Sequence, residues 1–268
     1  MLENPRSPRV RAVSKLTKRS ARNESGLFLL EGPQAVREAL QFRSDSIVDL
    51  YATPAAWERH ADLREGADRN RISVTLASEA VLDAMADTVT PQGVIAVAKQ
   101  WPATLDEVFA ARPVLLAVCE QVRDPGNLGT IIRAADAAGA DGVILTGKTV
   151  DPYNPKVVRS TTGSLFHVPI VVGADVADVM SRCREAGLTT IAADVKGEDL
   201  LEARSAGVLA QPTAWLFGNE ARGLEDEALA LADRALKLPI YGRAESLNLA
   251  TAASVCLYES AFAQRTKS

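Results

Sequence analysis

The sequence predicts an α/β protein with a small N-terminal domain and a larger C-terminal domain built on a parallel sheet. Short apolar, strand-like runs alternate with helical patterns along most of the 268 residues, and the connections between them are short. The run Val114–Cys119 is apolar throughout, which is typical of a strand covered on both faces of a parallel sheet. A chain of this length has room for two modest domains, each with its own core.

Composition narrows the class of protein. With 47% hydrophobic and 24% charged residues, and with neither a bilayer-spanning run nor a signal-peptide pattern, we expect a cytoplasmic protein with no membrane partner. Cys119, Cys183 and Cys256 are odd in number and far apart, which fits neither a disulfide framework nor a metal site. Because His60 and His167 are the only histidines, a histidine-based triad or metal centre is not expected either.

The first part of the chain is predicted to be a basic helix followed by an alternating series of strands and helices. The basic helix covers residues 8–22. Residues 101–104 are expected to leave the domain, and residues 105–111 to form a linker helix. The predicted strands lie at 27–30, 47–52, 72–76 and 94–99, and the predicted helices at 34–42, 55–69 and 78–86, the last capped by Ser78.

The second series begins at Pro113 and ends in a long helix. We predict that Ser246 caps this helix, because its hydroxyl can accept a hydrogen bond from a free amide of the first turn. From Leu249 to Phe262 the helix is apolar nearly all round, which is typical of a buried helix. The predicted strands lie at 114–119, 142–146, 168–172, 189–193, 214–217 and 236–240, and the other helices at 127–138, 155–166, 175–186 and 224–232.

Charge is unevenly distributed along the chain. The whole chain carries −4, whereas the first 23 residues carry +6, which leaves −10 for the rest. A basic arm on an acidic body suggests local contact with phosphates, and a solvated, frayed terminus is the alternative. The candidate phosphate-binding residues of the arm are Arg9, Arg11, Lys15, Lys18, Arg19 and Arg22.

Three loops are expected at the carboxyl edge of the second sheet, where α/β proteins place their ligands. They cover residues 121–129, 216–224 and 236–248, and each contains Gly, Asn or Glu. Their glycines fit neither the GxGxxG nor the P-loop spacing, so a nucleotide-binding enzyme of Rossmann type is disfavoured. Together the loops predict a site for a flat, polar, partly cationic ligand that is bound through backbone groups.

These loops carry a specific resemblance. The stretches 124–133, 216–220 and 238–248 resemble the three motifs of the SpoU/TrmH family of the SPOUT superfamily, which are RNA 2′-O-ribose methyltransferases that use S-adenosylmethionine. Residues 28–32 and 90–94 resemble the accessory substrate-binding domain of that family, which is similar to the ribosomal-protein L30e fold. The stretch 151–159 matches a further family segment, and its Lys156 and Arg159 are candidate RNA-binding residues.

The resemblance implies a basic N-terminal arm over 1–23, an L30e-like RNA-binding domain over 24–104 and a trefoil-knotted methyltransferase domain over 105–268. It also implies a homodimer with the knot at the interface. Knots are almost absent from protein chains in general, so physical reasoning alone would not predict one. By motif match the catalytic set is Asn127, Arg133, Glu220, Ser246 and Asn248, and the S-adenosylmethionine site is lined by Gly218, Leu238, Ile240, Leu247 and Asn248.

The resemblance makes Arg133 the candidate for handling the proton of the ribose hydroxyl. Because a guanidinium stays charged, we expect Arg133 chiefly to stabilise the developing alkoxide and a neighbouring phosphate. The RNA is expected to be ribosomal, most simply 23S ribosomal RNA, since the accessory domain resembles a ribosomal-protein fold. Methylation of transfer RNA, and RNA binding without catalysis, are the alternatives.

Overall fold

The computed structural model describes residues 1–265 and divides into two compact units. The first consists of Met1–Trp101 together with Asp151–His167, and the second of Pro102–Val150 together with the chain from Val168 onward. The sequence predicted a single division near residue 104, with a separate arm before residue 24. The structure instead places both the arm and the segment 151–167 in the first unit, because both contribute buried side chains to it.

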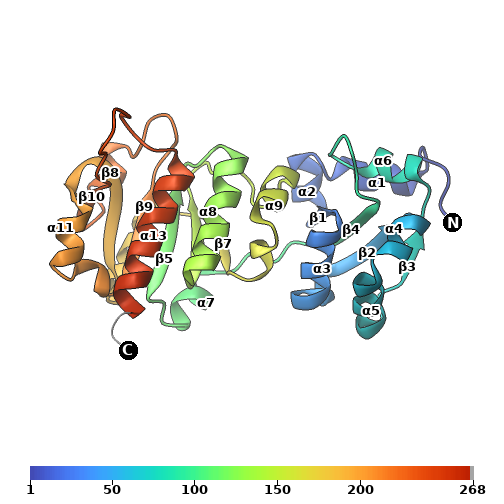
Figure 1. Cartoon of the computed structure of the whole chain (residues 1–268), viewed down its shortest axis with the longest axis horizontal. Helices are drawn as coiled ribbons and strands as arrows, with labels where there is room; N and C mark the ends of the chain where they lie inside the picture. Colours follow the sequence, from blue (N-terminus) through green and yellow to red (C-terminus); the bar gives the residue numbers. More distant parts are fainter. Residues whose placement is uncertain (266–268) are drawn as a thin grey trace. The chain divides into compact units, whose positions relative to one another are not determined.

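The first unit is built on a four-stranded sheet in the order β1-β4-β2-β3 (Figure 1). Strand β4 is antiparallel to β1 and β2, and β2 is parallel to β3. Helices cover both faces, with α3 and α5 on one face and α1 and α6 on the other. Its elements are α1 (Pro8–Lys15), α2 (Arg19–Ser25), β1 (Leu27–Glu31), α3 (Pro33–Phe42), η1 (Ser44–Ser46), β2 (Ile47–Ala52), α4 (Pro54–Arg59), α5 (Ala61–Asn70), β3 (Val74–Leu76), α6 (Glu79–Met85), β4 (Val94–Lys99), α9 (Pro155–Thr161) and η2 (Ser164–Phe166).

The predicted basic arm is an integral part of this unit. Residues 8–25 form two helices rather than one, and the break between them falls at Leu16. Val10, Val13 and Leu16 are buried in a core cluster that also contains residues of α6 and β4. Ser7 caps α1 by accepting a hydrogen bond from the Val10 amide, and Pro8 occupies the first turn. The arm therefore folds with the sheet instead of extending from it.

Two of the arm's basic residues have structural partners. Arg22 is only 1% exposed, and its guanidinium binds the carboxylate of Asp151 from Nε at 2.8 Å and from Nη2 at 2.7 Å. The predicted RNA-contacting role of Arg22 is therefore wrong, since its side chain has no surface to offer to a phosphate. Arg9 forms an ion pair with Asp49 at 2.5 Å and donates to the hydroxyl of Tyr51. The side chains of Arg11, Lys15, Lys18 and Arg19 remain exposed.

The second unit is built on a six-stranded sheet in the order β10-β8-β9-β5-β6-β7, and every neighbouring pair is parallel. The predicted α/β class with a parallel sheet is thus confirmed. Its elements are α7 (Leu105–Ala110), β5 (Leu115–Glu120), α8 (Pro125–Ala138), β6 (Gly142–Thr146), β7 (Ile170–Ala174), α10 (Val176–Glu185), β8 (Thr189–Asp199), α11 (Leu200–Ser205), η3 (Val208–Ala210), β9 (Thr213–Phe217), α12 (Asp226–Leu229), β10 (Arg234–Lys237) and α13 (Leu249–Arg265).

Alternate residues of the central strands face two helical layers. Leu116 of β5 and Leu216 of β9 join the core cluster formed with α7, α10 and α12. Trp215 faces the other layer, where its Nε1 donates to the buried hydroxyl of Ser260 on α13 at 2.9 Å. Figure 1 shows α8 and α13 side by side over this face. No helix within residues 1–265 combines the length and apolar character that crossing a membrane requires.

Strand β10 approaches its neighbour β8 closely where the register of the pair shifts. Strand β10 pairs with Ala192 of β8 through Ala235 and then with Glu198 through Leu236, so residues 193–197 of β8 are passed over. At Gly197 a Cβ atom would collide with the backbone between Ala235 and Leu236. Only glycine therefore permits this approach of two backbones, and the register shift follows from it.

Candidate active site

The three predicted loops follow β5, β9 and β10 at one edge of the second sheet. Because β5 and β9 are neighbours, the loop after Glu120 and the loop after Phe217 lie next to each other. The Asn219 side chain joins them by donating to the carbonyl of Gln121 at 2.9 Å. Its Oδ1 also accepts from the amides of Ala221 and Arg222, which closes the second loop into a turn.

Glu220 holds the start of α8 from the neighbouring loop. Its carboxylate accepts hydrogen bonds from the backbone amides of Arg123 at 3.2 Å and Asp124 at 2.9 Å. It also lies 3.4 Å from the side-chain nitrogen of Asn127. Asp124 in turn caps α8 by accepting from the Asn127 amide at 2.8 Å. Glu220 is thus a negative group at the N-terminus of α8, where free amides favour it.

Asn127 and Asn248 connect the first motif to the third. The side-chain nitrogen of Asn248 donates to Oδ1 of Asn127 at 3.0 Å. The Oδ1 of Asn248 accepts from the amides of Ala250 and Thr251, so Asn248 is the N-cap of α13. The prediction that Ser246 caps this helix is wrong, because the helix begins two residues later than expected and Ser246 makes no hydrogen bond with residues 1–265.

Arg133 stands apart from this cluster. It lies six residues after Asn127 on α8, which corresponds to about 9 Å along the helix axis. Its side chain is exposed, and it makes no ion pair or hydrogen bond with another residue in the described part of the chain. The guanidinium is therefore free to bind an incoming phosphate or oxyanion.

The residues predicted to bind S-adenosylmethionine are Gly218 and a segment without regular structure. Gly218 is buried, and a Cβ there would lie 2.5 Å from the backbone carbon of Gly223, so the turn leaves no room for a side chain. Residues 239–247 make no hydrogen bond to any residue between 1 and 265. Ile240 and Leu247 of this segment are 37% and 41% exposed. Free amides and carbonyls beside exposed apolar side chains fit the adenosine of this ligand, which offers both a flat ring and hydrogen-bonding edges.

The structure also points to two features that the sequence did not. Asn219 lay inside a recognised motif, but its role in joining two loops follows only from the contact with Gln121. Residues 193–197 lie beside β10 where its register shifts, and Gly197 was the one sequence signal for this crossing. A hollow of about 390 Å³ borders Gln121 and Asn219, but none of the predicted cofactor-binding residues lines it.

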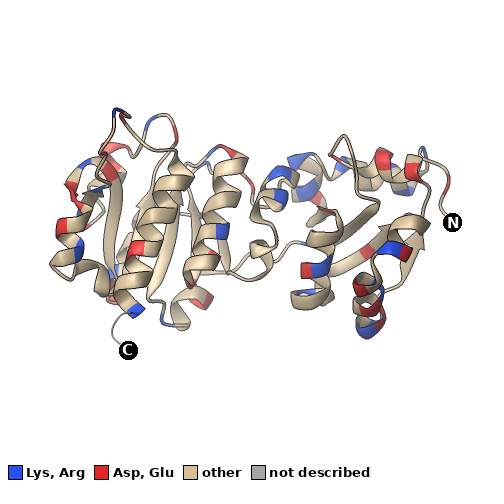
Figure 2. Ribbon diagram, viewed as in Figure 1, with Lys and Arg blue, Asp and Glu red and all other residues tan. Residues whose placement is uncertain are grey.

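Outside the second unit, the predicted RNA-binding residues are distributed over α1, α2 and α9. Figure 2 shows Lys and Arg on these helices and acidic residues on α6, which packs against α1. Lys156 is exposed at the start of α9. Arg159 is partly buried and forms ion pairs with Glu31 at 3.3 Å and Asp87 at 3.0 Å. Lys156 is therefore available to a phosphate, whereas Arg159 already has two carboxylate partners.

Comparison with known proteins identifies the family. Residues 114–258 match the model of the SpoU rRNA methylase family. The chain belongs to this family. Residues 7–96 match a second model, the MRM3-like substrate binding domain, and this match includes all of α1 and α2. The SpoU match contains the loops tied together by Glu220, Asn127 and Asn248.

Relatives of this SpoU protein extend over nearly its whole length. The 23S rRNA (guanosine(2553)-2′-O)-methyltransferase RlmP of Bacillus subtilis is 34% identical over 96% of this chain and 97% of its own. The 23S rRNA (uridine(2479)-2′-O)-methyltransferase of Streptomyces viridochromogenes is 33% identical over 91% and 85%. A crystal structure of an AdoMet-bound rRNA methyltransferase from Sinorhizobium meliloti matches with a TM-score of 0.81, at 32% identity over 97% and 96% of the two chains.

Proposed function

We propose that this protein is a cytoplasmic enzyme that transfers a methyl group from S-adenosylmethionine to a ribose 2′-hydroxyl of 23S ribosomal RNA. The hydrogen-bonded chain Glu220–Asn127–Asn248 is the observation that carries the proposal, since it joins all three motif loops at one edge of the sheet. Both curated relatives described above are named for methylation of a 23S rRNA ribose, one at a guanosine and one at a uridine. Membership of the SpoU family supports the same chemistry.

The residues have distinct tasks in this reaction. When bound, S-adenosylmethionine supplies a methyl group that its positively charged sulfur has already activated. The protein therefore has mainly to hold the ribose oxygen in line with that methyl group, and positioning of this kind can supply much of an acceleration. Leu238, Ile240 and Leu247 would hold the adenosine, together with the free backbone groups between them and Gly218 of the neighbouring loop. We propose that the polar chain from Glu220 to Asn248 fixes the loops around the ribose.

Arg133 is proposed to stabilise the oxyanion that forms as the 2′-hydroxyl loses its proton. A guanidinium presents several donors in a fixed plane and can bind an alkoxide and an adjacent phosphate at once. The exposed, unpartnered state of Arg133 among the described residues supports this role, because no structural contact would have to break. Arg133 cannot readily serve as the base, since its side chain stays protonated.

The function is tested with an unmodified 23S rRNA transcript and methyl-labelled S-adenosylmethionine. We expect label in a single ribose, detected as one linkage that resists alkaline cleavage. Replacement by Arg133→Lys keeps the charge but loses the planar fork, and should slow single turnover roughly 10- to 100-fold, from the loss of one or two charge-assisted hydrogen bonds. Arg112→Lys, at an exposed position outside the site, is the matched control and should retain the normal rate.

Other outcomes would redirect the proposal. Labelling of transfer RNA but not of the 23S transcript would make the protein a transfer-RNA methyltransferase. Binding of RNA without binding of S-adenosylmethionine, measured by calorimetry, would make it a non-catalytic RNA-binding protein. A near-normal single-turnover rate for Arg133→Lys would remove Arg133 from the mechanism.

We further propose that the enzyme is a homodimer that buries α13 and has a trefoil knot at the interface. Val255, Tyr258 and Phe262 leave 36–53% of their surface exposed on a helix whose opposite face is buried, and the rings of Tyr258 and Phe262 are 5.5 Å apart. An exposed apolar row of this kind favours a protein partner. The replacement Phe262→Glu should shift the mass measured by light scattering from dimer to monomer at micromolar concentration. A wild-type protein that is already monomeric and active would contradict the proposal.

A further inference from the structure

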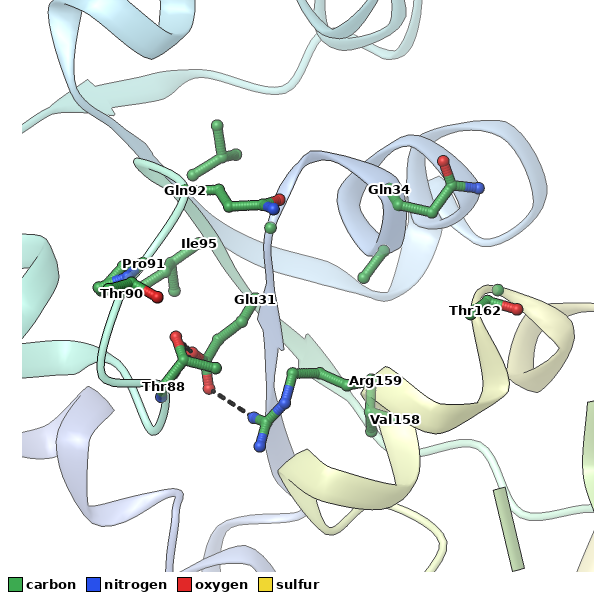
Figure 3. A pocket seen from close by; sticks show the side chains of 14 residues that line it. Glu31, Gln34, Thr88, Thr90, Pro91, Gln92, Ile95, Val158, Arg159 and Thr162 are labelled. Atoms are coloured by element: carbon green, nitrogen blue, oxygen red, sulfur yellow. Dashed lines mark hydrogen bonds and ion pairs between the residues drawn. The ribbon is translucent and has the colours of Figure 1, made fainter. Parts of the chain in front are cut away.

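A small cavity lies within the first compact unit, far along the chain from the methyl-transfer residues (Figure 3). It has a volume of about 230 Å³ and is bordered by the start of α3, by the loop 88–92 and by α9. Pockets for drug-sized ligands usually measure roughly 300–1,000 Å³, so this cavity suits something smaller, such as a single ring system.

Part of the cavity wall is apolar and rigid. Val94 and Ile95 are the first two residues of strand β4, and Val158 lies on α9. All three line the cavity and have at most 3% of their surface exposed. These side chains are fixed by the core behind them and make the floor of the cavity rigid. The partly exposed ring of Pro91 adds apolar surface that a flat ligand ring can contact.

A charged network holds the loop beside the cavity in place. The carboxylate of Glu31 has only 5% of its surface exposed and accepts from the amides of Asp87 at 3.0 Å and Thr88 at 3.1 Å. It also accepts from the Thr88 hydroxyl at 2.8 Å, and Arg159 reaches it at 3.3 Å. Arg159 is paired with Asp87 as well, so one cation faces two carboxylates. This side of the cavity has no surplus positive charge for a phosphate, which favours an uncharged ligand.

Several other polar groups of the lining lack protein partners within residues 1–265. They include the Gln92 carboxamide, the hydroxyls of Thr90 and Thr162, and the backbone amides of Gln34 and Ala35 at the start of α3. Figure 3 shows Gln92 and Thr90 on one side of the cavity, with the pair of Glu31 and Arg159 nearby. Donors and acceptors are therefore both present, as the edge of a nucleobase requires.

Gly32 allows the Gln92 carboxamide to lie across the start of α3. Its φ of +89° is unfavourable for other residues, and a Cβ there would lie 3.0 Å from Oε1 of Gln92. The carboxamide can therefore reach over Gly32 at the edge of the cavity.

We propose that this cavity binds the base of one unpaired nucleotide of the RNA substrate, with the ring against Pro91 and Val158 and its polar edge at Gln92. Proteins usually read RNA sequence through unstacked bases of this kind. The inference rests on the proposed function, because it takes the substrate to be RNA. The bound nucleotide is distinct from the methylated one, since none of the proposed methyl-transfer residues lines the cavity. The cavity thus selects which stretch of RNA is presented for methylation.

The test measures how each protein variant binds RNA fragments that lack a single base. A substrate fragment is prepared with a single abasic site at each unpaired position in turn, and its dissociation constant is measured with wild type, Gln92→Ala and Gln41→Ala. Gln41 is an exposed glutamine on α3 that borders a different hollow of the same unit, so Gln41→Ala is the matched control. We expect Gln92→Ala to weaken binding of the intact fragment roughly two- to tenfold, as the loss of one hydrogen bond implies.

The inference is decided by whether the effect of the missing base depends on the protein variant. At one position, removing the base should weaken binding to wild type and to Gln41→Ala, but clearly less to Gln92→Ala, because the contact has already been lost. Ala35→Val, which adds two methyl groups to the cavity wall, should show the same loss of coupling while retaining wild-type thermal stability. If every abasic site has the same effect on wild type as on both cavity variants, the inference is overturned. Methylation of 23S rRNA by wild type without such coupling would overturn this inference alone, whereas absence of RNA binding would overturn the proposed function as well.

Discussion

Replacing Arg22 by alanine should destabilise the first unit strongly, although the residue belongs to a segment that reads as a basic arm. The three guanidinium nitrogens of Arg22 all have partners, with Nε and Nη2 on Asp151 and Nη1 on the carbonyls of Leu16 and Thr17, each at 2.9 Å. Removal leaves Asp151 without its counter-ion, at 10% exposure of its side chain. Breaking a buried ion pair usually costs about 3–5 kcal/mol. We expect the lower end, about 3 kcal/mol, because Asp151 keeps its hydrogen bond from the Tyr153 amide at 2.9 Å.

Equilibrium unfolding in urea measures this loss directly. Trp57 and Trp101 lie in the first unit and Trp215 in the second, so single-tryptophan versions report on each unit separately. Arg19→Ala, at an exposed position on the same helix, is the control and should change the free energy of unfolding by less than about 0.5 kcal/mol. A double replacement, Arg22→Met with Asp151→Leu, should recover part of the loss because no charge is then left buried.

The outcome also separates stability from RNA binding. If Arg22→Ala unfolds within about 1 kcal/mol of wild type, below the range for a broken buried pair, the ion pair does not hold the segment 151–167 to the first unit. The exposed residues Lys18 and Arg19 should behave in the opposite way, since their loss should leave stability unchanged and reduce the salt dependence of RNA binding. Deleting residues 1–22 should therefore both destabilise the first unit and reduce the salt dependence of RNA binding. The deletion alone could not serve as a test of phosphate contact.

Two further predictions concern the second unit. Asn248→Ala removes both the cap of α13 and the hydrogen bond to Asn127, so we expect a loss of about 1 kcal/mol in stability and a lower single-turnover rate, whereas Ser246→Ala should leave stability unchanged. Burial raises the pKa of the Cys119 and Cys183 thiols to about 12, so at pH 8 both should react with iodoacetamide about a thousandfold more slowly than in the unfolded chain. The same raised pKa values make stability fall as the pH rises above 9.0, where unfolded thiols ionise and the folded ones keep their protons. Rapid labelling of the native protein at pH 8 would show that these cysteines are not buried.

The elements that the sequence predicted well are those whose signal is local. The strand Gly142–Thr146 and the strand Ile47–Ala52 were predicted with their observed bounds, because each is a short, mostly apolar run. The predicted helix over 55–69 is interrupted at His60, where the backbone leaves the helical region, and no apolar periodicity indicates such a break. The helical layers followed from the alternation of strands and helices.

The features that the sequence missed depend on distant partners. The burial of Arg22 is explained by Asp151, which is 129 residues away, whereas the charge pattern around Arg22 resembles a solvated arm. The cap of α13 falls on Asn248 rather than Ser246 because Asn248 also meets Asn127, 121 residues earlier. Three of the predicted catalytic residues, Glu220, Asn127 and Asn248, do come together, and their motifs were visible in the sequence. Their hydrogen bonds were not, since these depend on how β5 and β9 are paired.

The segment 151–167 has a consequence for how the protein is made. It is inserted between β6 and β7 of the second unit, yet it belongs to the first, so the chain passes between the units at 101–102, 150–151 and 167–168. A ribosome must therefore synthesise β5, α8 and β6 before the first unit has all of its parts. A gene cut at the apparent boundary near residue 104 would encode a first unit without α9, without Asp151 and without one wall of its cavity. The two units can thus be exchanged between relatives only if the segment 151–167 is transferred together with the N-terminal part of the chain.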